Sequence, residues 1–166
     1  MKLPSLLINV MVFQLGWFAC VLAGNTIAVG YLACALWIHY RFVSTQRREW
    51  LLVFAATLLG VGLDSLLTQL GIFHFESRTL GLIPLWLICL WCLFATTLCH
   101  SMRWLHGRLI LSSLLGGAAG ASSYYAGYLL GVVDFPYPML TSTMVLALCW
   151  AVLFPVLMIM AHKVVR

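Results

Sequence analysis

Hydrophobic positions along this chain form six long stretches separated by short polar segments. A helix of about 20 apolar residues crosses the hydrocarbon core of a bilayer. In lipid every backbone amide must be paired, and stretches this long and apolar achieve that as helices. The pattern predicts an all-α membrane protein, a bundle of six transmembrane helices with very short loops, spanning about 3–22, 26–42, 50–72, 80–100, 109–132 and 139–161.

Composition supports the same class. The 166 residues are 64% hydrophobic and 8% charged, with a mean hydropathy of +1.06. The six stretches use nearly the whole chain, so residues 1–166 are expected to form a single transmembrane domain with no room for a soluble catalytic module. Any active site would be built from helix faces.

The basic residues fall mostly on one side of the expected bundle. Alternate assignment of the loops places eight of the nine on one side, and only Arg78 on the other. Cytoplasmic loops concentrate Lys and Arg, so both termini are expected in the cytoplasm. Because these cations flank apolar spans, the net charge of +5 indicates contact with anionic lipids, not nucleic acid. The eight are Lys2, Arg41, Arg47, Arg48, Arg103, Arg108, Lys163 and Arg166.

The first stretch also has features of a signal peptide. Lys2 precedes an apolar run that ends in the small-residue segment 21–23. Asn9 and Gln14 interrupt the apolar run, which is unusual for a signal sequence. Retention as the first span is therefore favoured over cleavage.

The fifth stretch has little side-chain bulk. Gly116 and Gly120 form a small-xxx-small pair, and Gly127 and Gly131 continue the pattern on another face. Such positions let two helix backbones approach closely. A central packing helix is expected. A dimer interface is the other interpretation, so homo-oligomer formation stays open.

Asp64 is the only acidic residue deep in a stretch, and such residues usually face the bundle interior. Gln14, Ser123 and Tyr124 are expected at a similar depth, with Gln69 about one turn further out. These side chains form a candidate intramembrane polar site, in which Asp64 is a protonatable acceptor or a hydrogen-bonding anchor. The alternative is a structural aspartate that fixes helix register.

A second polar group is expected nearer the cytoplasmic side. Asn9 in the first stretch lies at about the level of Thr96, Thr97 and His100 in the fourth. An interhelical hydrogen bond is the commoner explanation for such a group, and a second polar pocket is the alternative.

Three cysteines share one face of the fourth stretch. Cys89, Cys92 and Cys99 have the spacing of a weak candidate metal or redox site. Structural zinc needs four converging ligands, and a reactive thiolate favours a helix N-terminus over a mid-helix position. Buried, soft packing residues are the simpler explanation, and no cofactor is expected.

The chain resembles an uncharacterised family of small polytopic bacterial inner-membrane proteins known only as a domain of unknown function. The residues that carry the resemblance are Asn9, Gln14, Trp17, Gly62-Leu63-Asp64, Pro84-Leu85-Trp86-Leu87, Leu90-Trp91, the segment 94–98, Ser123-Tyr124, Gly127 and Leu130-Gly131. The resemblance implies a bacterial inner-membrane location and carries over no catalytic residue. Members are often encoded near cyclopropane-fatty-acid synthase-like and other lipid-modifying proteins, which implies a link to membrane lipids.

Three hypotheses for function follow. The first is a non-catalytic accessory component associated with lipid modification or envelope stress adaptation, with membrane lipids and other membrane or lipid-modifying proteins as partners. The second is a small proton-coupled transporter or lipid-handling protein that uses Asp64. The third is an intramembrane redox or metal enzyme that uses Cys89, Cys92 and His100.

Overall fold

The computed structural model describes residues 3–76 and 82–166 and confirms the all-α class. Lys2 and Arg78, which entered the charge count, lie outside the described residues. The described part of the chain forms five α-helices and one short 3₁₀ turn, η1. The elements are α1 (Leu3–Phe42), α2 (Arg47–Gln69), α3 (Leu85–Ala95), η1 (Arg103–Leu105), α4 (Leu109–Leu129) and α5 (Met139–Val165).

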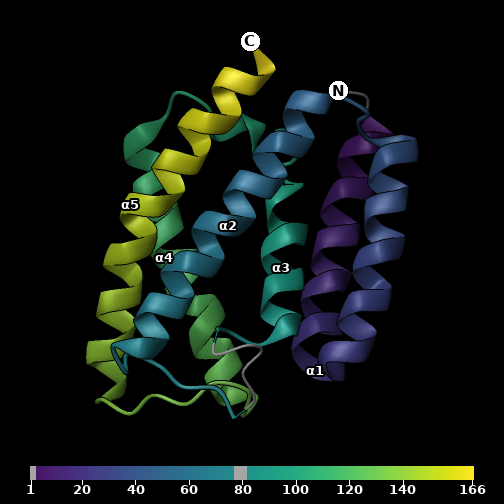
Figure 1. Cartoon of the computed structure of the whole chain (residues 1–166). Helices are drawn as coiled ribbons and strands as arrows, with labels where there is room; N and C mark the ends of the chain where they lie inside the picture. The colour runs from purple at the N-terminus through teal and green to yellow at the C-terminus, as the bar shows by residue number, and fades with distance from the viewer. Residues whose placement is uncertain (1–2, 77–81) are drawn as a thin grey trace.

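The expected count of six separate helices is not supported. The stretches 3–22 and 26–42 belong to one element, α1, in which Gly24 is non-helical with φ 73° and ψ −175°. Glycine adopts a positive φ without the steric cost that a Cβ brings. Figure 1 shows α1 folded into two arms that lie side by side, an N-terminal arm (residues 3–23) and a C-terminal arm (residues 25–42).

Among the described helices, three are long and apolar enough to cross a membrane, namely α1, α2 and α5. α4 has 21 residues, but glycine, serine and tyrosine dilute its apolar character. α3 has 11 residues, so it is only about 16 Å long at 1.5 Å per residue. Of the rest of the expected span 80–100, residues 80–81 lie outside the described part, residues 82–84 precede α3 without helical structure, and residues 96–100 form turns.

Two asparagines of α1 satisfy the ends of short α3. At its start, the backbone N–H of Trp86 donates to Asn25 Oδ1 at 3.0 Å. Near its end, Asn9 Nδ2 donates to the Thr96 carbonyl at 3.1 Å, and the N–H of Ser101 donates to Asn9 Oδ1 at 3.3 Å. Helix ends leave backbone groups unpaired, so α1 supplies partners that let a short helix stay buried.

α4 packs along α5 through its small residues. A Cβ added to Gly116 or Gly120 would overlap the side chains of Phe154 and Trp150, respectively. Gly127 faces Val133. Gly131, expected on the same packing ladder, has φ 72° in the turn after α4, and nothing lies within 4 Å of an added Cβ there.

A proline in α5 creates a second contact between α4 and α5. Pro155 has no N–H and cannot donate to the carbonyl of Ala151 one turn earlier. Ser113 of α4 donates its hydroxyl to that carbonyl at 2.7 Å. The side chain of one helix therefore replaces the bond that the other helix lacks.

Basic residues of three helices gather at one end of the molecule. Figure 1 shows the start of α1, the end of α1, the start of α2 and the end of α5 at one end of the bundle. These segments carry Arg41, Arg47, Arg48, Lys163 and Arg166. At the opposite end, the backbones of His74 and Asp134 pair through N–H···O bonds of 2.8 and 2.9 Å.

Candidate functional site: an aromatic cavity and two buried carboxylates

Two stacked tryptophans lie at the centre of the bundle. The rings of Trp91 (α3) and Trp150 (α5) are 5.0 Å apart and nearly parallel, at 6°. A Cβ at Gly60 of α2 would overlap the Trp91 indole, and one at Gly120 of α4 would overlap Trp150. The absence of side chains at these two glycines makes room for the pair, so four helices meet around it.

Asp64 holds one of these tryptophans in place. Its side chain is fully buried, and Oδ2 accepts two hydrogen bonds of 2.6 Å, from Trp91 Nε1 and from the Tyr124 hydroxyl. The carboxyl group thus joins α2 to α3 and α4. Its other oxygen, Oδ1, is buried and has no hydrogen-bond partner among the described residues.

Trp91 and Tyr124 also form part of the wall of a cavity of about 710 Å³. The cavity lies between the N-terminal arm of α1, α3, α4 and α5, and Asp64 lies behind its wall. Its lining is mainly apolar and aromatic. The lining residues with large apolar side chains include Phe13, Trp17, Phe75, Trp86, Leu87, Leu90, Trp91, Phe94, Trp104, Tyr124, Trp150 and Phe154.

The cavity opens on the surface of the bundle between α1 and α4. Gln14 on α1 and Ala119 and Ser122 on α4 line the cavity and are exposed. At this opening Trp17 Nε1 donates to Ser123 Oγ at 3.0 Å, linking the N-terminal arm of α1 to α4. A ligand in the cavity would therefore lie beside a polar bridge and reach the lateral surface of the helices.

The residues expected around Asp64 divide among different environments. Tyr124 contacts Asp64 directly. Gln14 lines the cavity, Ser123 bonds to Trp17, and Gln69 is exposed near the end of α2. Trp91 was not among the residues expected in this site, although an indole N–H in mid-span needs an acceptor and Asp64 is an available one.

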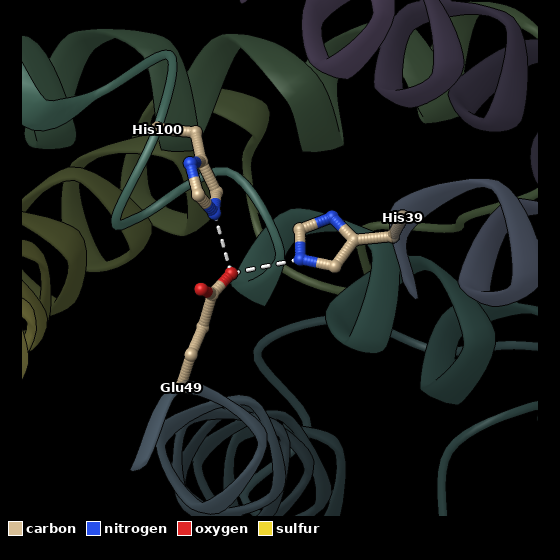
Figure 2. Close-up of side chains that lie close together, drawn as sticks. All are labelled: His39, Glu49 and His100. Atoms are coloured by element: carbon tan, nitrogen blue, oxygen red, sulfur yellow. Dashed lines mark hydrogen bonds and ion pairs between the residues drawn. The ribbon is translucent and has the colours of Figure 1, made fainter. Parts of the chain in front are cut away.

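The residues of the second expected polar group also lie in different environments. Asn9 bonds to the turn after α3, as described above, and the Thr97 hydroxyl donates to the Phe94 carbonyl at 2.6 Å. His100 joins a different cluster, in which its Nε2 lies 2.5 Å from Glu49 Oε1. His39 Nε2 lies 2.7 Å from the same oxygen. Figure 2 shows both imidazoles directed at this oxygen.

We call these three residues the His39–Glu49–His100 cluster. His39 lies near the end of α1, Glu49 in the first turn of α2, and His100 between α3 and η1. Their side chains are 4%, 5% and 11% exposed, respectively. Glu49 was not among the expected site residues, because it lies one residue before the expected third span, in a segment expected to be a loop.

The cysteines are free thiols. Cys89 and Cys99 are buried and Cys92 is partly buried, and the Cys99 thiol lies 4.0 Å from the Ala161 carbonyl. Among the described residues, the group of side chains with ligand atoms close enough to share a metal ion is the His39–Glu49–His100 cluster. It shares only His100 with the expected redox or metal site.

A second pair of histidines lies between η1 and the end of α5. The rings of His106 and His162 are 5.5 Å apart, and His106 Nε2 lies 2.9 Å from the Leu98 carbonyl. Burial lowers the pKa of His106, which favours its neutral form.

The apolar helices define a membrane-associated protein of several helices with an internal aromatic cavity. The chain belongs to the family described as "Protein of unknown function (DUF2878)", which it matches over residues 6–156. This confirms the resemblance seen in the sequence. No curated protein and no solved structure matches the chain.

Proposed function

We propose that this protein is a non-catalytic component of the bacterial inner membrane that binds the hydrocarbon chain of a membrane lipid in its aromatic cavity and presents that lipid to lipid-modifying proteins. The observation that carries the proposal is the apolar cavity that opens between α1 and α4. Its volume of about 710 Å³ lies within the range of about 300–1,000 Å³ usual for small-molecule sites.

The chemistry of the lining supports a hydrocarbon occupant. Aromatic rings such as Phe94 and Phe154 offer large apolar contact area. The Trp17–Ser123 bond at the opening is polar but already paired, and the Asp64 carboxyl group lies behind the wall. The interior therefore favours a chain without charge, while a lipid head group would remain outside.

The lateral opening supports a membrane lipid over a water-soluble ligand. Its rim residues lie on the exposed surface of α1 and α4, the surface that faces lipid when these helices lie in a bilayer. A lipid chain could enter from the bilayer without crossing water. The role beside lipid-modifying proteins rests on the gene neighbourhood that the family resemblance implies.

Filling the cavity tests the proposal. Ala119 lines the cavity and is exposed, so Ala119→Phe adds a ring at the cavity opening. Ala118→Phe is the matched control, because Ala118 is the adjacent exposed alanine and does not line the cavity. Each protein is reconstituted in vesicles with a phospholipid that carries a photoreactive diazirine on its acyl chain, and the labelled peptides are identified by mass spectrometry.

We expect the wild type and Ala118→Phe to be labelled on cavity residues of α3 and α4, and Ala119→Phe to lose at least tenfold of that labelling. Equal labelling of the two variants would contradict the proposal. So would wild-type labelling confined to the outer faces of α2 and α5.

A second candidate function is proton-coupled transport through Asp64. The observation that favours it is the buried Oδ1, which has no partner among the described residues. An additional proton or a substrate donor at this oxygen would complete its hydrogen bonding. Comparison of Asp64→Asn with Asp64→Leu separates this function from an anchoring role.

A further inference from the structure

We propose that the His39–Glu49–His100 cluster binds one divalent transition-metal ion, with Zn²⁺ as the reference ion. This inference does not depend on the lipid-binding proposal, because the cluster and the cavity are built from different side chains. It also differs from the cysteine site expected from the sequence, which shares only His100.

The three side chains offer suitable ligand atoms at suitable distances. The two imidazole Nε2 atoms and the Glu49 oxygen all lie within 4.8 Å of one another. Ligand atoms around tetrahedral zinc, with bonds of about 2.0–2.2 Å, lie roughly 3.3 Å apart. The observed 2.7 and 2.5 Å separations therefore need to widen by less than about 1 Å, which small side-chain rotations supply.

The placement of the ligands favours a specific site over a chance surface group. Figure 2 shows three ligands from separate ribbon segments that converge on one point. All three are largely buried, and a buried carboxylate is costly unless it is paired or binds a metal ion. Two histidines and one carboxylate leave coordination positions open, as in catalytic zinc and non-haem iron(II) sites.

The competing explanation is a hydrogen-bonded cluster without an ion. In that case both Nε2 atoms must carry a proton, since both lie within bonding distance of one carboxylate oxygen. Metal binding requires the Nε2 lone pairs instead. Each neutral imidazole that binds the ion would therefore carry its proton on Nδ1.

The test uses the full-length protein with a tag that contains no histidine, purified in detergent and stripped with a chelator. Zn²⁺ stoichiometry is measured by elemental mass spectrometry, and Co²⁺ is added as a spectroscopic probe. Fe²⁺ and Mn²⁺ titrations compare ion preference. The variants are Glu49→Gln, which keeps the side-chain shape, and His100→Asn. His162→Asn is the control, because it changes a histidine of the neighbouring pair.

We expect one Zn²⁺ per wild-type chain, visible Co²⁺ absorption bands and at least tenfold weaker binding in Glu49→Gln and His100→Asn, with His162→Asn unchanged. The inference is overturned if the folded wild type binds no ion, if Glu49→Gln binds as tightly as wild type, or if His162→Asn loses the ion. Because the wild-type measurement stands alone, misfolding of a variant does not remove the test. The Zn²⁺ measurement does not depend on whether a lipid chain labels the cavity. The two proposals can therefore fail separately.

Discussion

At the scale of single residues, Asp64 organises the centre of the molecule through two hydrogen bonds. Trp91 and Tyr124 come from different helices, and both line the cavity. A substitution at Asp64 therefore reaches the cavity through these two neighbours. This makes Asp64 a positioning residue in the lipid-binding proposal.

Removing the acceptor should destabilise the fold more than neutralising it. Asp64→Leu leaves the Trp91 N–H and the Tyr124 O–H buried without their acceptor, at about 1–3 kcal/mol each. Asp64→Asn keeps a carbonyl oxygen that can accept both bonds, so we expect a smaller loss. Thermal unfolding of the detergent-purified proteins measures the difference, with Gln69→Leu, at an exposed position of the same helix, as the near-neutral control.

Equal losses for Asp64→Asn and Asp64→Leu would contradict the anchoring role. If Asp64→Asn keeps its stability but abolishes a pH-dependent transport activity of the wild type, proton coupling is supported instead. In the lipid-labelling experiment, Asp64→Asn should be labelled on its cavity residues about as strongly as the wild type if Asp64 is an anchor.

The sequence could single out Asp64 because a lone carboxyl group in an apolar run is costly at any register. It could not assign the partners, because depth along a helix does not fix which face meets which neighbour. Gln14 was expected at the same depth yet lies at the cavity opening, while Trp91 makes the contact. Likewise, the pairing of His39 with Glu49 depends on how α1 returns after Gly24.

At the scale of helices, backbone groups that one element leaves unpaired are satisfied by side chains of another. Asn9 and Asn25 bond to the two ends of α3, and Ser113 bonds to the carbonyl that Pro155 leaves free. Within a bilayer no water replaces such partners. These few polar side chains therefore fix how the apolar helices are placed.

The Ser113 bond should contribute more stability while Pro155 is present. Ser113→Ala is expected to cost about 0.6 kcal/mol, the average for interhelical bonds in membranes, and at most about 1.7 kcal/mol. In a Pro155→Ala background the restored N–H pairs with the Ala151 carbonyl, so the same substitution should cost less. The free energy of unfolding of the two single variants and the double variant gives a double-mutant cycle that measures this difference.

Ser122→Ala is the control for this cycle, since the exposed Ser122 hydroxyl bonds within its own helix to Ala118. It should change stability little in either background. A Ser113→Ala cost that is the same with and without Pro155 would show that the proline does not create the need for this bond.

The helical stretches themselves were predictable from hydropathy, since the bounds of α4 and α5 fall close to the expected 109–132 and 139–161. The break between the first two stretches was predictable as well, since the expected bounds 3–22 and 26–42 leave the non-helical Gly24 between them. The early end of α3 was not, because a span that is helical for only 11 residues has the same apolar pattern as a regular span. Hydropathy indicates burial in the bilayer, whereas the end of α3 depends on tertiary hydrogen bonds.

At the scale of the whole molecule, the described basic residues of α1, α2 and α5 gather at the end of the bundle where α1 starts and α5 finishes. Cations resist translocation across bacterial inner membranes. The proposed orientation therefore has both termini and the loop between α1 and α2 in the cytoplasm, with the loop after α4 outside.

Reporter fusions test this orientation. A fluorescent protein inserted at Thr45, or fused after Arg166, should fold in the cytoplasm and fluoresce, and alkaline phosphatase at the same sites should be inactive. Insertion near Pro136, in the loop between α4 and α5, should give the reverse pattern. An active phosphatase at Thr45 would show that the bundle is inverted.

The paired tryptophans at the centre have a consequence for spectroscopy. Two indoles whose ring centroids lie 5.0 Å apart interact electronically, so the near-ultraviolet circular dichroism of the folded protein should change when either Trp91→Phe or Trp150→Phe removes one ring. Both rings form part of the cavity wall. The same signal should therefore respond to assembly of the centre and to a molecule that enters the cavity.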